Sequence, residues 1–250
     1  MTTCATVTVN VNSNSVAATS ISATVNPICP GDNTTLSVVG GSLGTGANWE
    51  WYSTSCAGTA IGSGNSVVVN PSVSTTYFVR AEGTCNTTSC VSITINTNTL
   101  STDPTSITAT TSTICDGAST TLMVNGGTLG TGANWEWYTG SCGGTSVGSG
   151  ASISVSPSTS TTYFVRAEGS CNNSGCVSVM VTVNPIPTPS ITSSGADLCD
   201  GDMLNLTGTP AGGTFSVTSG PGSVVANVLT ATGPGTINLE YSVTTMGCTG

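Results

Sequence analysis

Apolar and polar residues alternate with a period of two in a series of short segments along the first hundred residues. Turns rich in glycine, asparagine and proline separate these segments. This period is typical of β-strands that bury one face. The expected strands cover residues 18–28, 34–39, 48–53, 59–62, 66–70, 76–83 and 90–96. Seven short strands within about 86 residues predict a β-sandwich of two packed sheets.

The same alternation assigns side chains to the two faces of the central strands. In segment 48–53, Trp49 and Trp51 share one face, and Tyr52 lies on the other. In segment 76–83, Tyr77 shares the inner face with the following valine and alanine. We therefore expect Trp51 in the core, and Tyr77 at the corner where its strand begins.

An internal duplication is the strongest pattern in the chain. Residues 28–95 align with 114–181 without a gap, and 45 of these 68 positions are identical. A diverged third copy begins at Leu198. The sequence around Cys4 also matches the sequence around Cys90, so the first residues resemble the last strand of a preceding copy.

The duplication predicts four parts: residues 1–14 as the last strand of a preceding repeat, 15–100 as the first repeat, 101–186 as the second repeat, and 187–250 as a diverged repeat truncated before its last strand. On this interpretation the chain is a piece of a longer array. The connections between copies are short and one is rich in proline, which favours modules in line and a rod-like array.

The charge of the chain excludes several classes of function. It has 2 basic residues, both arginines, 11 acidic residues, no histidine and a net charge of -9. Without histidine there is no serine–histidine or cysteine–histidine nucleophile pair. Two cations cannot neutralise a nucleic-acid backbone, so no nucleic-acid partner is expected. An enzyme is not expected, and a pair of carboxylates beside arginine would have lowered pKa values, which does not suit a general acid.

Composition also supports an ordered all-β fold. Only 5% of residues are charged and the mean hydropathy is +0.23, whereas disordered chains combine high charge with low hydropathy. Valine and threonine are abundant, and both favour strands. No apolar run approaches the length that spans a bilayer, so no membrane insertion is expected in this segment. The N-terminus lacks the features of a signal peptide.

Eleven cysteines without histidine indicate disulfides and an oxidising compartment, rather than zinc. Strand directions favour bonds within each repeat: 29–56 and 85–90, then 115–142 and 171–176. The disulfide cysteines predicted in this way are Cys29, Cys56, Cys85, Cys90, Cys115, Cys142, Cys171 and Cys176. A bond between Cys29 and Cys171, joining two modules, is the alternative. The partners of Cys4, Cys199 and Cys248 stay open, with a Cys199–Cys248 bond as one possibility.

Charged and aromatic residues gather on the outer face of the two central strands. The set comprises Glu50, Tyr52, Phe78 and Arg80, with Glu82 beside them, and recurs as Glu136, Tyr138, Phe164 and Arg166, with Glu168. One interpretation is structural, a cross-strand ion pair of small energetic effect. The other is a ligand face, on which the rings stack against a sugar and the charged groups bind its hydroxyls. Repetition would make such a site multivalent.

A second cluster comprises Asp197, Asp200 and Asp202. Carboxylates at this spacing are weak candidates for a calcium site. Aspartate and glycine also suit an ordinary turn between two strands, which is the alternative. No other metal and no organic cofactor is expected.

Several motifs together resemble a known family. They are Ile-Cys-Pro-Gly-Asp at 28–32, Trp-Glu-Trp-Tyr at 49–52, Thr-Thr-Tyr-Phe-Val-Arg-Ala-Glu-Gly at 75–83, and the two cysteines before Val-Ser-Ile-Thr-Ile. The sequence resembles the Ig-like repeats of giant Bacteroidota surface proteins, such as SprB-type gliding-motility adhesins. The resemblance implies type IX secretion, a place on the bacterial cell surface, and a role in adhesion or gliding. It supplies no catalytic residues.

Three functions are consistent with these features. The first is a structural stalk or adhesin repeat region that presents or mediates adhesion. In the second, each repeat binds polysaccharide weakly and multivalently. The third is a self-assembling fibre subunit that uses strand addition, since edge strands with few charges invite it. Expected partners are neighbouring Ig-like repeats of the same chain, surface polysaccharides or other surface proteins.

Overall fold

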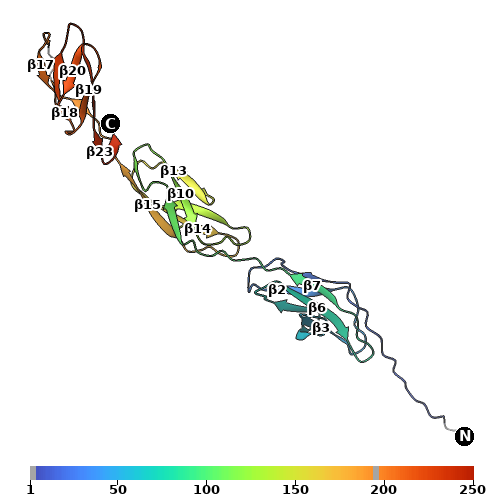
Figure 1. The fold of residues 1–250 in the computed structure, drawn as a ribbon. Coiled ribbons are helices and arrows are strands. Elements are labelled where there is room, and N and C mark those ends of the chain that lie inside the picture. The colour runs from blue at the N-terminus through green and yellow to red at the C-terminus, as the bar shows by residue number, and fades with distance from the viewer. Residues whose placement is uncertain (1–3, 194–196) are drawn as a thin grey trace. The chain divides into compact units, whose positions relative to one another are not determined.

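The computed structural model describes residues 4–193 and 197–250, and these residues form strands, turns and loops without a helix (Figure 1). The prediction of an all-β sandwich fold is therefore confirmed. The chain divides into two compact units. One contains residues 4–102, 127–134 and 167–174, and the other contains the remaining described residues.

The first repeat folds as two antiparallel sheets. Its strands are β1 (Ser20–Ala23), β2 (Thr34–Val39), β3 (Asn48–Ser53), β4 (Thr59–Ser63), β5 (Ser66–Val69), β6 (Thr75–Glu82) and β7 (Val91–Ile95). The sheets have the orders β1-β2-β5 and β4-β3-β6-β7. The expected strand at 18–28 is shorter than predicted: β1 ends at Ala23, and the N–H and C=O of Val25 bond to the Thr34 hydroxyl rather than to the backbone of β2. Beyond it, Ile28 pairs in parallel with Thr97 beside the other sheet.

The second repeat has the same architecture. Its strands are β8 (Ser106–Ala109), β9 (Thr113–Cys115), β10 (Thr120–Asn125), β11 (Asn134–Thr139), β12 (Thr145–Ser149), β13 (Ser152–Val155), β14 (Thr161–Glu168) and β15 (Val177–Asn184). The sheets have the orders β13-β10-β8 and β12-β11-β14-β15-β9. Here the parallel pairing onto β15 is long enough to form the additional strand β9.

The C-terminal segment is built from shorter strands. They are β16 (Ser190–Ile191), β17 (Met203–Asn205), β18 (Gly208–Thr209), β19 (Thr214–Ser219), β20 (Gly222–Val225), β21 (Val228–Ala231), β22 (Asn238–Ser242), β23 (Thr244–Thr245) and β24 (Cys248–Thr249). Its longest pairings are β17-β21-β20 and β19-β22. Phe215 and Tyr241 stack with ring centroids 4.4 Å apart, and no tryptophan occurs in this part of the sequence.

The core of each repeat is centred on a tryptophan, as the alternation predicts. Trp51 and Trp137 are each 0% exposed. Their indole N–H groups donate to the backbone oxygens of Gly64 and Gly150, both at 2.8 Å, so each buried polar group has a partner. Around them lie the fully buried aliphatic residues Leu36, Val79, Ile95, Leu122, Val165 and Val181.

Residues 4–14 lie outside any strand. The side chains of Val7, Val9 and Val11 are 86%, 75% and 92% exposed. The sequence predicts a strand here that completes a preceding repeat, but within residues 4–193 and 197–250 no strand pairs with this segment. Hydrogen bonds between Ser13 and Thr45 hold the end of the segment. β-favouring residues alone do not make a strand without a partner strand.

Candidate functional site

The predicted face of charged and aromatic residues lies where β3 and β6 pair. Glu50 stands opposite Arg80 and Tyr52 stands opposite Phe78 in the antiparallel register. All four side chains therefore emerge on the outer face, because β-strand side chains alternate and paired residues point the same way.

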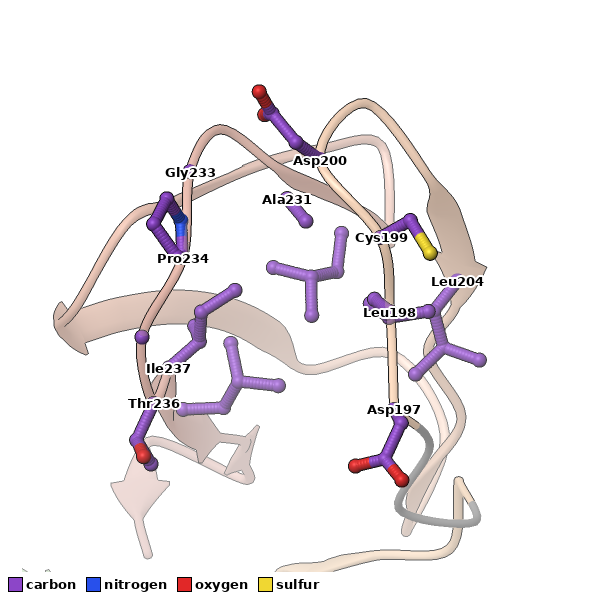
Figure 2. A pocket seen from close by; sticks show the side chains of 13 residues that line it. Asp197, Leu198, Cys199, Asp200, Leu204, Ala231, Gly233, Pro234, Thr236 and Ile237 are labelled. Atoms are coloured by element: carbon purple, nitrogen blue, oxygen red, sulfur yellow. The ribbon is translucent and has the colours of Figure 1, made fainter.

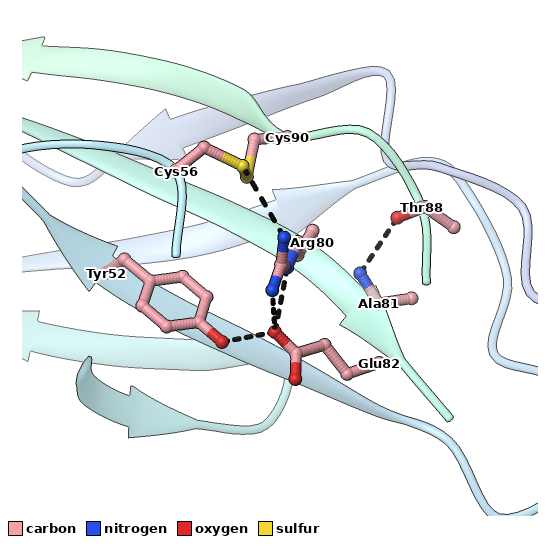
Figure 3. A network of polar contacts seen from close by, with 7 residues as sticks. All are labelled: Tyr52, Cys56, Arg80, Ala81, Glu82, Thr88 and Cys90. Atoms are coloured by element: carbon pink, nitrogen blue, oxygen red, sulfur yellow. Dashed lines mark hydrogen bonds and ion pairs between the residues drawn. A yellow bond between two sulfur atoms is a disulfide. The ribbon is translucent and has the colours of Figure 1, made fainter. Parts of the chain in front are cut away.

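The ion pair on this face runs along β6 rather than across the sheet (Figure 3). The Nε and Nη2 atoms of Arg80 both lie 2.7 Å from Oε1 of Glu82. The hydroxyl of Tyr52 donates to the same carboxylate oxygen. Glu82 thus accepts hydrogen bonds from two side chains, and the carboxylate orients both the guanidinium and the ring.

The Arg80 guanidinium lies between an aromatic ring and a disulfide (Figure 3). Its Cζ is 5.4 Å from the centroid of the Tyr52 ring, and its Nη1 is 4.0 Å from Sγ of Cys56. The second repeat reproduces this arrangement. Arg166 Cζ lies 5.6 Å from the Tyr138 centroid, and Arg166 Nη1 lies 3.8 Å from Sγ of Cys142. Cation–π contact and charge-assisted hydrogen bonds together fix the position of the guanidinium.

These contacts shift the acid–base equilibria of the cluster. The hydrogen bond to Glu82, with burial, raises the pKa of Tyr52 above 10.0. The hydrogen bonds from Tyr52 and Arg80 lower the pKa of Glu82 below 4.5. The carboxylate is therefore ionised, and the phenol neutral, at ordinary pH. This electrostatic arrangement stabilises the cluster and provides no proton donor for chemistry near neutral pH.

Little of the tyrosine rings remains for a ligand. Tyr52 is 9% exposed and Tyr138 is 8% exposed. Phe78 and Phe164 are half-buried, so they are the aromatic residues of this face that reach solvent. The ligand-face interpretation therefore depends on the phenylalanines, with Glu50 and Glu136 as polar neighbours.

Four disulfides are present: Cys29–Cys171, Cys56–Cys90, Cys115–Cys248 and Cys142–Cys176. The predicted pairs 29–56, 85–90, 115–142 and 171–176 are wrong. The alternative bond 29–171 is the one that the structure contains. Cys85, expected in a disulfide, is free and exposed, as are Cys4 and Cys199.

Loop geometry explains why the predicted pairs fail. The loop after β3 folds back over the outer face of β6 and carries Cys56 to Arg80, beside Cys90 at the start of β7 (Figure 3). Strand directions alone place Cys56 at the end of the sheet, close to Cys29. Cys29 is then left to bond with the hairpin of the following repeat, at a Cα–Cα distance of 5.4 Å.

The aspartate cluster lies beside a cavity of about 640 Å³ in the C-terminal segment (Figure 2). The cavity is lined by both apolar and polar residues, among them Leu204, Leu229 and Asp197. The side chain of Asp200 points away from it (Figure 2).

The three predicted calcium ligands of this cluster, Asp197, Asp200 and Asp202, are exposed. Asp202 Oδ2 accepts a hydrogen bond from the backbone N–H of Cys199 at 2.8 Å. This contact agrees with the turn interpretation. Among the described residues, no three acidic, cysteine or histidine side chains are grouped as metal ligands.

Across residues 4–193 and 197–250, no helix has the length and apolar character needed to cross a membrane.

A family model described as "Ig-like domain CHU_C associated" matches residues 16–98 and 102–185. A search of curated proteins finds no match. Among solved structures, the chain is similar to the ectodomain of mouse nectin-like molecule 4, with 14% identity, a TM-score of 0.33, and coverage of 68% of this chain and 66% of that one. It is similar to murine CEACAM1b, with 14% identity, a TM-score of 0.40, and coverage of 67% and 99%.

A third solved structure, the ICAM-5 D1-D4 fragment, matches with 12% identity, a TM-score of 0.45, and coverage of 92% of this chain and 73% of that one. For the nectin-like ectodomain, the matched part is less than two thirds of that chain. At these identities the likeness concerns the Ig fold alone.

Proposed function

Because the chain belongs to the family of Ig-like domains described as CHU_C associated, we propose that it is a structural repeat region of a bacterial cell-surface adhesin. In this function, consecutive modules carry mechanical load and hold an adhesive part of the protein away from the cell. The motifs shared with the repeats of gliding-motility adhesins support this proposal, and they extend it to secretion by the type IX pathway.

The observation that carries the proposal is the linkage of consecutive repeats by disulfides. Cys29–Cys171 and Cys115–Cys248 span 142 and 133 residues of sequence, and their spans overlap. While both bonds are intact, unfolding one repeat cannot release its full length of chain. Disulfides of this kind suit a protein exposed to force in an oxidising environment. The absence of lysine, with only 2 basic residues, also leaves few sites for trypsin-like proteases.

The proposal is tested by stretching single molecules held at their ends, with and without reductant. Reduction should increase the end-to-end length of the fully stretched chain by on the order of 500 Å, since roughly 150 residues become free to extend at about 3.5 Å each. A matched variant, with Cys29, Cys115, Cys171 and Cys248 replaced by serine, should gain most of that length without reductant. It should stay shorter than the reduced protein by the two loops of sequence separation 34 that Cys56–Cys90 and Cys142–Cys176 still close. If the oxidised protein extends as far as the variant, the bonds carry no load and the stalk function is refuted.

A second candidate function is polysaccharide binding by the faces around Phe78 and Phe164. The half-buried ring beside Glu50, repeated beside Glu136, favours it. The test is a polysaccharide array probed with the wild-type chain, the Phe78→Ala/Phe164→Ala variant and the Phe78→Leu/Phe164→Leu variant. Binding that both variants lose would assign the rings to ligand stacking. Wild-type protein that binds no polysaccharide would eliminate this function.

A further inference from the structure

Two free cysteines occupy positions whose equivalents in other repeats are bonded. In each of the two bonds between repeats, a cysteine at the turn before β2 or β10 joins a hairpin cysteine of the next repeat. Cys29 joins Cys171, and Cys115 joins Cys248. Cys199 is the turn cysteine of the C-terminal segment, equivalent to Cys29 and Cys115. Cys85 is the hairpin cysteine of the first repeat, equivalent to Cys171. Both are exposed.

The backbone around Cys199 already has the geometry of the bonded turn cysteines. The carbonyl oxygen of each turn cysteine accepts a hydrogen bond from the residue three positions later, at 3.0 Å for Cys29, 2.9 Å for Cys115 and 3.0 Å for Cys199. The glycine two positions after each cysteine has φ of 84°, 79° and 88°. This is the pattern of a type II turn. Figure 2 shows the Cys199 thiol directed away from the cavity beside it.

The hairpin that carries Cys85 is equally matched to the hairpin of Cys171. In the first, the N–H of Gly83 donates to the Asn86 oxygen at 3.1 Å, and the N–H of Thr88 donates to Ala81 at 2.9 Å. In the second, the two equivalent hydrogen bonds have the same lengths, 3.1 and 2.9 Å. The asparagine side chain after each cysteine also makes the same pair of bonds to a serine backbone, Ser15 or Ser101.

Charge favours a turn cysteine meeting a hairpin cysteine. Each turn carries one or two carboxylates: Asp32 in the first, Asp116 in the second, and Asp200 with Asp202 in the third. The hairpin residues that flank Cys85, Cys171 and Cys248 are uncharged. Two turns facing each other would bring like charges together, which is unfavourable, whereas a turn facing a hairpin meets no repulsion.

We propose that Cys199 and Cys85 are complementary half-sites of a further disulfide between repeats, each bonding to another module of this fold that presents the other half. In a solution of this chain alone, that partner is a second copy, joined head to tail. The inference goes beyond the stalk function, because it assigns a covalent partner to two exposed side chains and predicts chain elongation.

The bond forms by thiol–disulfide exchange with a small disulfide such as oxidised glutathione. The Cys199 thiolate attacks one glutathione sulfur, forms a mixed disulfide and releases one glutathione thiol. The Cys85 thiolate of the second copy then attacks the Cys199 sulfur and releases the second glutathione thiol. The two protein thiols are oxidised, and the glutathione disulfide takes up both electrons.

The test uses two variants of the full chain in a Cys4→Ser background, since Cys4 is equivalent to Cys90, which bonds within its own repeat. One variant adds Cys85→Ser and leaves only Cys199 free. The other adds Cys199→Ser and leaves only Cys85 free. All replaced cysteines are exposed and unbonded, so the four disulfides should persist, which peptide mapping without reduction checks.

Each variant alone in a glutathione redox buffer should stay monomeric. Their mixture should give a heterodimer about tenfold or more above either homodimer, the ratio for a preference of about 1.4 kcal/mol. Mapping should identify a Cys85–Cys199 peptide pair, and the Cys4→Ser chain with both half-sites should form a ladder of multimers. Homodimers and heterodimers in statistical proportion, or monomers throughout, would overturn the proposal.

Discussion

The first and second repeats are near copies, and the loops that follow β3 and β11 differ in residues that matter for backbone conformation. Their disulfides across the outer face have the same Cα–Cα distance, 6.0 Å. The loop after β3 holds Thr54 and Ala57 at φ of 69° and 61°, whereas the equivalent loop after β11 has Gly140 and Gly143 at 82° and 73°. Positive φ is unfavourable for residues with a side chain, most of all for a β-branched one. The fold therefore imposes this loop conformation, even on residues that disfavour it.

The cost of the imposed conformation falls on the first repeat. A left-handed backbone costs an ordinary residue about 1–2 kcal/mol. The Thr54 hydroxyl donates to the Ser53 oxygen at 2.6 Å and offsets part of this cost. The benefit is the position of Cys56, which the loop brings to Cys90 and Arg80. The comparison teaches that the disulfide and the arginine contact outweigh local backbone preference.

The largest predicted effect tests whether the hydrophobic cores of the first and second repeats contribute equally to stability, as their similar sequences suggest. Replacing Trp51 or Trp137 by alanine should cost about 3–5 kcal/mol in the repeat concerned, since both rings are fully buried. Hydrogen exchange measured on peptides from each repeat separates the two effects. Each repeat serves as the internal control for the other, and unequal losses would show that the cores are not equivalent.

The next effect concerns the disulfides across the outer face. Each closes a loop of sequence separation 34, so the Cys142→Ser/Cys176→Ser change should cost about 3–4 kcal/mol in the second repeat. Cys56→Ser/Cys90→Ser should cost the first repeat less, because the strained loop relaxes once the bond is gone. Denaturant titration followed by hydrogen exchange measures both. A larger loss in the first repeat would contradict the imposed-strain explanation.

Single substitutions in the loops should have opposite signs. Ala57→Gly should stabilise the first repeat by about 1 kcal/mol, because the backbone strain is removed. Gly143→Ala should destabilise the second repeat by at least as much, since an added Cβ would also lie 3.0 Å from Nη2 of Arg166. Thermal unfolding of both variants checks the signs, and equal signs would refute the interpretation.

The smallest effect is a dependence on pH in the first repeat. The folded-state pKa of Glu82 is lowered, so its contribution is present above the unfolded pKa and is lost as pH falls through the folded value. The pKa of Tyr52 is raised, so its contribution is present below 10.0 and is lost as pH rises through the folded value. Glu82→Gln should remove the acid dependence that this cluster contributes. Tyr52→Phe should remove one part of the alkaline dependence, since burial also raises the pKa of Tyr77 in the same repeat. Unfolding measured across pH tests both, and unchanged profiles would contradict the cluster's role.

The order of the strands and the residues of the core could be predicted from the sequence. Period-two alternation located β2, β3 and β6 because these strands bury one face and expose the other. It also assigned Trp51 to the interior, and Trp137 occupies the equivalent position in the second repeat. It overextended the first strand, since alternation continues past Ala23, where the Thr34 hydroxyl replaces the backbone partners of Val25.

The cysteine pairing was only partly accessible from the sequence. The C-terminal segment keeps Cys199 and Cys248 but has no equivalent of Cys56. This was a signal that turn cysteines do not require a partner in their own repeat. The decisive fact, the loop that returns over β6, depends on φ values that Thr54 and Ala57 disfavour, so local sequence argued against it. Alternation also placed Arg80 and Glu82 on one face, but it could not show that they pair along their own strand rather than across the sheet.

The sequence alone determined the features that depend on local pattern and composition: an all-β chain, strands at fixed intervals, a tryptophan core and an oxidising environment. These follow from alternation and composition, which act residue by residue. The tertiary structure decided which cysteines meet, that Arg80 pairs with Glu82 along its own strand, and that the Tyr52 ring is covered. Those outcomes depend on where loops return over a sheet, and a loop follows the lowest free energy of the whole repeat rather than the preference of its own residues.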